Sequence, residues 1–402
     1  MKKINIIGAS TLAAWEGNHV TTRLPNALRR AVRWGSSAVG IACLLITTAA
    51  GAGETWATFA SGAGVNGPVR AVTPFGGDLI VGGQFGTAGG VTGTSAIASW
   101  NGSAWSALGT GMNNTVMCLA TFGTDLIAGG LFTTASGTTV NYIAKWNGST
   151  WSPLGTGMNG VVYALAEFNG ALYAGGAFTK AGGTTVNYIA KWNGSTWSSV
   201  ASGMNGNVRA LTTFTGALYA GGEFTKAGNA NGFNRIAKWS GSAWSKLGTG
   251  VGGSSIVFAL TSFNGSLMVG GQFAMAGGVA GTPGIARWSG SAWSALGSGL
   301  NNTVMSLATF DDLSGSGTEL YVGGYFTAPV GGAANSAVQI ARWNGAWSAV
   351  GSGMVVTQPG DSQPRGVFAL SPNPSGDLLF AGGFCEVSPH TVGVAGYLMG
   401  YH

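Results

Sequence analysis

One pattern of hydrophobic and polar positions recurs along most of the chain. A unit reads V-x-A-L, then L-Y-x-G-G-x-F, then a polar loop rich in Gly and Thr, then I-A-K-W, N-G-S and x-W-S-x-L-G. Each block is a short run rich in Val, Leu, Tyr, Phe and Trp, bounded by Gly, Asn, Ser or Thr, which is typical of a β-strand. Each unit therefore predicts four antiparallel strands.

The unit occurs seven times, with steps of 46 to 49 residues and one final step of 63. A four-stranded unit of this length is typical of one blade of a β-propeller, and a β-solenoid is the alternative repeat architecture. The first blocks begin at Val69, Val116, Val162, Val208, Val257, Val304 and Val367.

The two ends of the chain favour the propeller. The seventh unit ends with V-A-G-Y at 394–397 and lacks its x-W-S-x-L-G strand, whereas TWATFASG at 55–62 is such a strand without a unit. In a closed ring the extra N-terminal strand can complete the last unit and so remove the free sheet edges, whereas an open solenoid has no place for such an exchange. We predict an all-β, seven-bladed β-propeller of four-stranded antiparallel blades, with the last blade closed by the N-terminal strand of the mature chain and Trp56 paired with Tyr397.

The repeat resembles known propeller families. Four apolar positions ending in Gly-Gly, followed by two spaced aromatics, are similar to the kelch-type propeller and to the central domain of galactose oxidase. The sequence IAKWNGSTWSPLGTG is similar to the short repeats of secreted bacterial propeller proteins and of fungal cortical-marker ectodomains. The resemblance covers residues 55–402 and implies a fold, not a reaction. It departs from kelch units in having Trp, or Tyr397, where those units usually have Tyr.

Residues 1–52 read as a secretory leader. Arginines at 29, 30 and 33 precede an uncharged run, and Ala50 and Ala52 have the spacing of a signal-peptidase site. The uncharged stretch 34–53 is long enough to span a bilayer once, so a retained anchor is the alternative. We predict cleavage near Ala52, a propeller domain over 53–402 with no stable membrane span after cleavage, and export to the bacterial periplasm, cell surface or medium.

The composition fits this architecture and argues against nucleic acid as a partner. The chain is 45% hydrophobic and 7% charged and contains 73 glycines, which is typical of an all-β protein with many tight turns. The formal net charge is +6, but residues 1–52 carry +5 of it. The nearly neutral body therefore has no electrostatic footprint for nucleic acid.

Two tryptophans five residues apart bracket Asn-Gly-Ser, as in IAKWNGSTWS at 143–152. Asn-Gly favours a hairpin turn, and the shorter copy WNGAW at 343–347 keeps both tryptophans. This favours cross-strand pairs that pack blade against blade; the alternative is a sugar site on exposed Trp faces in each blade. The repeat aromatics are Trp56, Trp100, Trp105, Trp146, Trp151, Trp192, Trp197, Trp239, Trp244, Trp288, Trp293, Trp343, Trp347 and Tyr397.

Positions that differ among the seven units are where we expect ligand recognition. Two such positions are the x of V-x-A-L and the x of Gly-Gly-x-Phe. Known propellers place the first strand at the axis, which implies a mixed aromatic and cationic ring near the channel. Ordinary packing between blades is the alternative interpretation. The candidate ligand-binding residues are Arg70, Tyr163, Arg209, Phe258, Phe368 and Glu223.

The sequence offers little catalytic chemistry. The body has two histidines, His390 and His402, which are too few for a multi-histidine metal site. Cys118 and Cys385 fall in different units without metal or redox spacing. We expect no metal or cofactor. Glu167 and Glu223 form the one carboxylate pair that we considered for glycoside hydrolysis.

These observations predict a secreted, non-enzymatic, monomeric propeller that binds a protein or a carbohydrate at the cell surface or outside the cell. A multivalent lectin with one site per blade is the alternative. A glycoside-acting enzyme is the third possibility.

Overall fold

The computed structural model describes residues 56–58, 64–253, 255–311, 317–332, 339–350, 366–372, 379–383 and 398–401. All of them belong to one compact unit, Ala49–His402. The predicted leader, Tyr397, His390, His402 and Cys385 lie outside the described residues.

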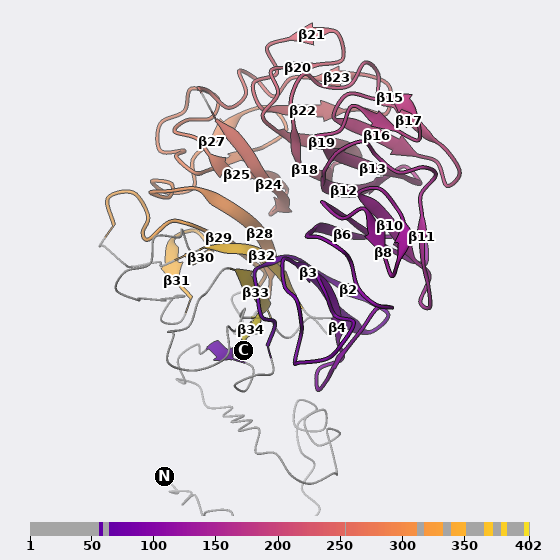
Figure 1. The fold of residues 1–402 in the computed structure, drawn as a ribbon. Coiled ribbons are helices and arrows are strands. Elements are labelled where there is room, and N and C mark those ends of the chain that lie inside the picture. Colours follow the sequence, from indigo (N-terminus) through magenta and orange to yellow (C-terminus); the bar gives the residue numbers. More distant parts are fainter. Residues whose placement is uncertain are drawn as a thin grey trace, which may run out of the picture. The chain divides into compact units, whose positions relative to one another are not determined.

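The fold is an all-β propeller of four-stranded antiparallel blades (Figure 1). In six sheets the strands lie in the order in which they occur in the sequence. A further four-stranded sheet has the order β1-β34-β33-β32. The predicted fold class and four-stranded blades are confirmed, while the count of seven blades and closure by the N-terminal strand stay predictions.

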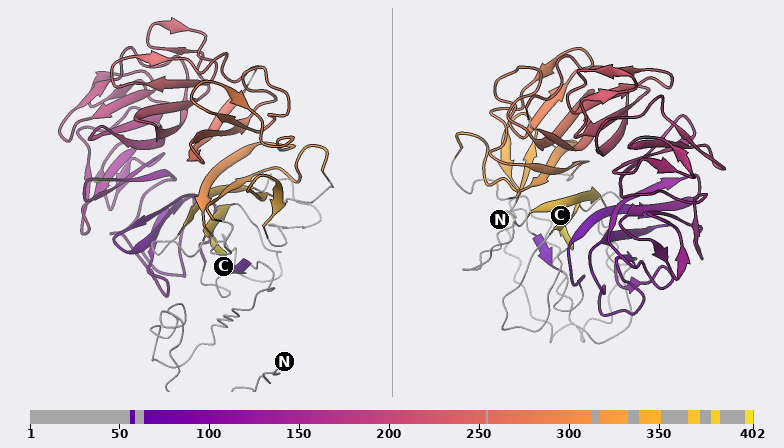
Figure 2. Two further views of the ribbon diagram at one scale, coloured as in Figure 1. Left: turned by 180° about the vertical axis from the view of Figure 1, so that it is seen from behind. Right: turned by 45° about the horizontal axis from the view of Figure 1, so that its top comes forward.

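The first strand of each sheet is the innermost, and these strands contact one another in order, with β32 contacting both β28 and β2 (Figures 1 and 2). The first strands are β2 (Val69–Phe75), β6 (Val116–Phe122), β12 (Val162–Phe168), β18 (Val208–Phe214), β24 (Ile256–Phe263), β28 (Val304–Phe310) and β32 (Val367–Pro372). The second strands are β3 (Asp78–Gly83), β7 (Asp125–Gly130), β13 (Ala171–Gly176), β19 (Ala217–Gly222), β25 (Ser266–Gln272), β29 (Glu319–Gly324) and β33 (Leu379–Gly383).

The third and fourth strands form the outer part of each sheet. The third strands are β4 (Ile97–Trp100), β10 (Ile143–Trp146), β16 (Ile189–Trp192), β22 (Ile236–Trp239), β26 (Ile285–Trp288), β30 (Ile340–Trp343) and β34 (Leu398–Tyr401). The fourth strands are β5 (Trp105–Ser106), β11 (Trp151–Pro153), β17 (Trp197–Ser199), β23 (Trp244–Ser245), β27 (Trp293–Ser294), β31 (Trp347–Ala349) and β1 (Trp56–Thr58).

Three of the polar loops carry a small hairpin of their own. These hairpins pair β8 (Thr134–Ala135) with β9 (Thr138–Thr139), β14 (Lys180–Ala181) with β15 (Thr184–Thr185), and β20 (Lys226–Ala227) with β21 (Ala230–Asn231).

The predicted pairing of Trp56 with Tyr397 is wrong in its register. Trp56 lies opposite Tyr401, and Tyr401 also pairs with Leu379. In the third sheet the same place, opposite Leu172, is held by Trp192. The segment L-M-G-Y therefore replaces V-A-G-Y as the third strand. Both segments end in Tyr four residues apart, so the sequence pattern could not separate them.

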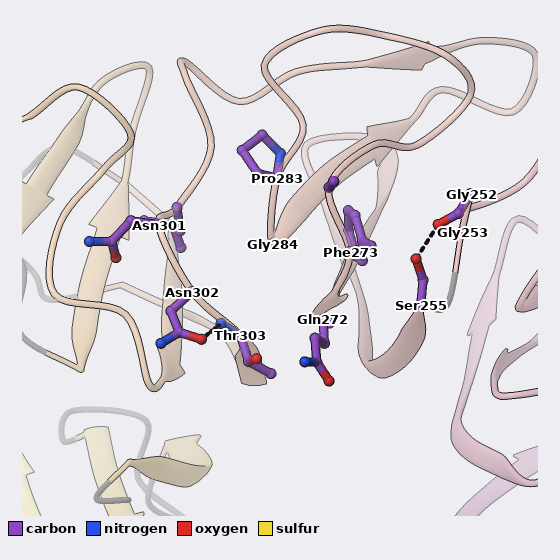
Figure 3. A pocket seen from close by; sticks show the side chains of 13 residues that line it. Gly252, Gly253, Ser255, Gln272, Phe273, Pro283, Gly284, Asn301, Asn302 and Thr303 are labelled. Atoms are coloured by element: carbon purple, nitrogen blue, oxygen red, sulfur yellow. Dashed lines mark hydrogen bonds between the residues drawn. The ribbon is translucent and has the colours of Figure 1, made fainter.

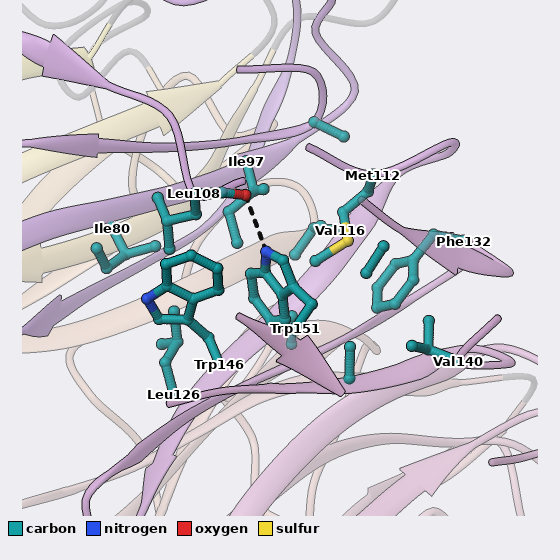
Figure 4. Close-up of a cluster of buried hydrophobic side chains, with 14 residues drawn as sticks. Ile80, Ile97, Leu108, Met112, Val116, Leu126, Phe132, Val140, Trp146 and Trp151 are labelled. Atoms are coloured by element: carbon teal, nitrogen blue, oxygen red, sulfur yellow. Dashed lines mark hydrogen bonds between the residues drawn. The ribbon is translucent and has the colours of Figure 1, made fainter. Parts of the chain in front are cut away.

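The hydrophobic core lies between neighbouring blades. One cluster joins Ile80 and Ile97 of the first blade to Leu126, Trp146 and Trp151 of the second (Figure 4). Equivalent clusters repeat around the described blades. Each blade thus buries its face against the next one, as repeat architectures require.

The first glycine of each Gly-Gly allows this close approach. A Cβ atom at Gly82 would lie 2.6 Å from Cγ1 of Val116 in the next blade, and one at Gly129 would lie 2.6 Å from Cγ1 of Val162. Real Cβ atoms do not approach other atoms so closely. The glycine and the valine of V-x-A-L therefore form a pair across the blade interface.

Candidate functional site

A β-bulge places the variable residue of V-x-A-L. In each of the seven first strands the register shifts between the Val and the residue two positions later, so the residue between them is left unpaired. Bulges re-aim side chains and recur beside functional sites. We call these unpaired residues the bulge residues: Arg70, Met117, Tyr163, Arg209, Phe258, Met305 and Phe368.

Two bulge residues from opposite ends of the sequence meet. The guanidinium carbon of Arg70, on β2, lies 4.2 Å from the ring centroid of Phe368, on β32. The ring of Tyr325, just after β29, meets Phe368 edge-on, with centroids 5.6 Å apart and an interplanar angle of 76°. The structure therefore joins two predicted candidates into one cluster and adds Tyr325, which holds the x position of Gly-Gly-x-Phe in its blade.

A second cluster joins three more predicted candidates. The guanidinium carbon of Arg209 lies 4.0 Å from the ring centroid of Tyr163. Arg209 Nη2 and Nε each lie 2.6 Å from Glu223 Oε1. Asn207 Nδ2 donates to Glu223 Oε2 over 3.0 Å. The carboxylate of Glu223 is therefore held by two side chains, Arg209 through an ion pair and Asn207 through a hydrogen bond.

Arg235 supports this second cluster from the loop before β22. Its Nη1 donates to the backbone oxygen of Glu223 over 2.7 Å, and its Nη2 donates to the oxygen of Gly253 over 3.2 Å. Its backbone has φ of 72°, in the left-handed region. The contact fixes the segment that carries Glu223.

Phe258 occupies the equivalent bulge of β24 and is half-buried. Among the described residues, no ring or cation contact joins it to either cluster. The structure thus assembles five of the six predicted candidates into two clusters, one of two residues and one of three. Phe258 lies at the equivalent bulge without such a contact among the described residues.

The charge of Arg70 is not neutralised within the described structure. Its Nε atom is buried there without a hydrogen-bond partner, and none of the ion pairs between described residues includes it. Burial lowers the pKa of Arg70, and Tyr325 opposes this shift. Burial likewise raises the pKa of Tyr325, and Arg70 opposes that shift. Because a guanidinium stays protonated in proteins, the cluster retains a positive charge.

The tryptophan pairs pack the blades together. Trp146 lies opposite Trp151, with ring centroids 5.3 Å apart, and both are buried. Trp151 Nε1 donates over 2.9 Å to the oxygen of Leu108 in the preceding blade (Figure 4). The same bond joins Trp197 to Leu154. The buried rings of these two pairs leave no open face for a sugar, which argues against these hairpins as a repeated lectin site.

The two carboxylates that we considered for hydrolysis lie apart. Glu167 pairs with Leu172 near the turn between β12 and β13, whereas Glu223 follows Gly222, which pairs with Val208 at the other end of the neighbouring strand. The two ends of the first strand, such as Val162 and Glu167, are five residues apart, which corresponds to about 16 Å. This distance exceeds the separation between the two carboxyl groups in either inverting or retaining glycosidases.

The hollow in Figure 3 has a volume of about 380 Å³ and lies between the fifth and sixth blades. Its polar lining comes from amide and hydroxyl groups, including Gln272, Asn301, Asn302 and Thr303, and no titratable side chain lines it. Within the described part of the chain, no group of three His, Cys, Asp or Glu residues could hold a metal ion.

Cys118 takes the place of the alanine of V-x-A-L in the second blade. Its thiol donates to the oxygen of Val162 over 3.8 Å, and burial raises its pKa well above the usual range. A raised pKa disfavours the thiolate, so this cysteine lacks the activation of a nucleophile.

Comparison with known proteins supports the fold alone. No protein-family model matches the chain, and no curated protein matches it. The extracellular domain of BT4673 from B. thetaiotaomicron matches with a TM-score of 0.54 and 13% identity, over 86% of this chain and 39% of that chain. A second structure of that domain gives a TM-score of 0.50 and 12% identity over the same shares. This chain therefore spans about two fifths of that domain.

The fold and these likenesses define the class: the protein is a β-propeller of four-stranded antiparallel blades. The kelch-type resemblance stays a prediction. Where the chain is described, it contains no helix that is both long and apolar enough for a membrane crossing.

Proposed function

We propose that this protein is an exported, non-enzymatic propeller that binds a ligand at the end of the channel where the bulge residues gather. The main support for this proposal is the variation at the bulge residues. Seven equivalent unpaired positions hold Arg, Met, Tyr and Phe, while the Val, Ala and Gly positions around them hardly vary. A scaffold that keeps its packing residues and varies one projecting position is suited to recognition.

Three observations support the absence of catalysis and the extracellular location. Glu223 is held in an ion pair with Arg209 and is not free to act as an acid or base. The leader of residues 1–52 has the layout of a secretory signal. The similar domain of BT4673 is named as extracellular.

Binding stoichiometry tests this function. We expect calorimetric titration with ligands found on glycan and cell-surface protein arrays to give one equivalent per chain. Phe258→Ala, at the bulge of β24, should weaken binding about 10-fold or more, because an aromatic platform is lost. Thr196→Ala, in an exposed hairpin at the opposite end of the strands, is the matched control.

Two results would contradict the proposal. Six or seven equivalents, lost by changes in the hairpins, would favour the multivalent lectin. Turnover of a ligand from these arrays, abolished by Glu167→Gln or Glu223→Gln in a folded protein, would favour the glycoside-acting enzyme.

We also propose that the ring has seven blades and is closed by β1. The pairing of Trp56 with Tyr401 supports this closure, as does the contact of β32 with β2. The glycine–valine pair recurs at this junction, where a Cβ at Gly382 would collide with Val69. A closed ring leaves no free sheet edge at the junction.

Removal of the closing strand tests this architecture. A chain that starts at Gly64 should melt about 1–2 °C lower than one that starts at Gly53, which corresponds to roughly 1 kcal/mol for a domain of about 350 residues. A peptide of residues 53–63, added in trans, should restore the melting temperature. A scrambled peptide is the control, and equal melting of both chains would contradict closure by β1.

A further inference from the structure

Two blades carry the same arginine arrangement. Arg70 and Arg209 occupy the bulge of β2 and of β18, and each stacks on the bulge aromatic of the preceding innermost strand, at 4.2 Å from Phe368 and 4.0 Å from Tyr163. The repeat thus places two guanidinium groups in matching surroundings.

The surroundings of the two arginines differ at one position of the repeat. At the x of Gly-Gly-x-Phe the fourth blade has Glu223, which pairs with Arg209, while the first blade has Gln84. Gln84 is exposed and neutral, so it cannot balance the charge of Arg70. Arg70 Nε accordingly has no partner among the described residues.

We propose that Arg70 binds the carboxylate of an acidic saccharide, which takes the place that the Glu223 carboxylate holds at Arg209. This inference rests on the proposed ligand-binding function of the bulge residues. The Arg209–Glu223 pair shows that a guanidinium stacked at this bulge can hold a carboxylate, there through Nε and Nη2. At Arg70 the Nε atom is buried, so the carboxylate would bind the Nη atoms. Such forked geometry suits a carboxylate.

The surroundings of Arg70 favour a saccharide over a protein as the bearer of the carboxylate. Tyr325 contributes a hydroxyl group and Gln84 an amide, both of which bind sugar hydroxyls. Protein interfaces instead require apolar and aromatic anchors at their centre. Among the described residues only two large hydrophobic side chains, Met275 and Val330, are exposed, and neither belongs to the cluster of Arg70.

Calorimetric titration with oligogalacturonate and oligoglucuronate tests the inference, with the corresponding neutral oligosaccharides as ligand controls. We expect one equivalent of an acidic oligosaccharide to bind and its affinity to fall as salt is added. Arg70→Met should weaken binding about 10- to 100-fold, the loss that one charge-assisted pair represents.

Two exchanges between the first and fourth blades, with one control in the fifth, make the test specific. Gln84→Glu installs the carboxylate of the fourth blade beside Arg70 and should weaken binding at least about 10-fold, because the charge is then neutralised within the chain. Gln272→Glu adds the same charge in the fifth blade, where the bulge residue is Phe258, and should weaken binding less. Glu223→Gln frees Arg209 and should raise the stoichiometry from one to two.

The outcomes separate this inference from the proposed function. If the acidic saccharide binds but Arg70→Met and Gln84→Glu change nothing, the inference fails and the proposed function stands. If an acidic peptide binds through Arg70 and no uronate does, the saccharide assignment is overturned. If no array ligand binds at the bulge residues, both fail. Because Gln84 is exposed, its variant keeps the test valid even where Arg70→Met folds poorly.

Discussion

Replacing Trp197 with alanine is expected to lower the free energy of unfolding by about 3–5 kcal/mol. The side chain is 6% exposed, and its ring lies 5.2 Å from that of Trp192, centroid to centroid. Its Nε1 also donates to the oxygen of Leu154 over 2.9 Å, which joins two blades. The change therefore opens a cavity, ends an aromatic pair and removes one of the two hydrogen bonds that the Leu154 oxygen accepts, the other coming from the N–H of Gly157. Urea unfolding followed by tryptophan fluorescence measures the loss.

Two related variants separate these contributions. Trp197→Phe keeps an aromatic ring but not the donor, and should cost about 1–3 kcal/mol. Trp244→Ala removes the equivalent residue of the next blade, which is half-buried and has a longer bond of 3.4 Å to Val200, so its effect should be smaller. A stability of Trp197→Ala within about 0.5 kcal/mol of the parent, the range of an ordinary surface substitution, would contradict a packing role for the pair.

Gly129→Ala is expected to destabilise the protein by about 1–3 kcal/mol through overpacking. The added Cβ would lie 2.6 Å from Cγ1 of Val162 and 2.8 Å from Sγ of Cys118. The two blades must then separate, or Val162 must leave its rotamer, because the interface is close-packed. The free energy of unfolding in urea again provides the measurement.

A second glycine serves as the control for Gly129. A Cβ at Gly252 would lie 4.0 Å from its nearest neighbour, the oxygen of Met275, so Gly252→Ala should change stability by less than about 0.5 kcal/mol. The double variant Gly129→Ala with Val162→Ala relieves the collision and should recover part of the loss. Equal stability of the two glycine variants would show that the blades are not in close contact here.

The repeat itself determined much of this fold. The V-x-A-L blocks predicted the start of the innermost strands, and β12 begins at Val162 as expected. The shortened hairpin likewise indicated the pairing of Trp343 with Trp347, which the register has. These features depend on local spacing and turn chemistry. Because the same pattern occurs in every unit, a chance match in one copy does not mislead the prediction. Hydrophobic period and turn residues are therefore sufficient for them.

The candidate site was only partly visible in the sequence. The variation at V-x-A-L pointed to Arg70 and Phe368, but not to their stacking, because contact between the two ends of the chain arises only when the innermost strands meet around the axis. The bulge beneath each variable residue was also missed. One extra residue per strand leaves the flanking Val and Ala both buried, so the pattern conceals it.

What the sequence by itself determined is therefore the unit: its length, its four strands, its paired tryptophans and the positions at which its copies differ. What only the tertiary structure decided is how the copies combine: that Arg209 finds Glu223 while Arg70 finds no carboxylate among the described residues, and that Tyr401 instead of Tyr397 faces Trp56. The physical reason is that local propensity acts over a few residues, whereas charge pairing and strand register at the junctions depend on neighbours that only the assembled blades bring together.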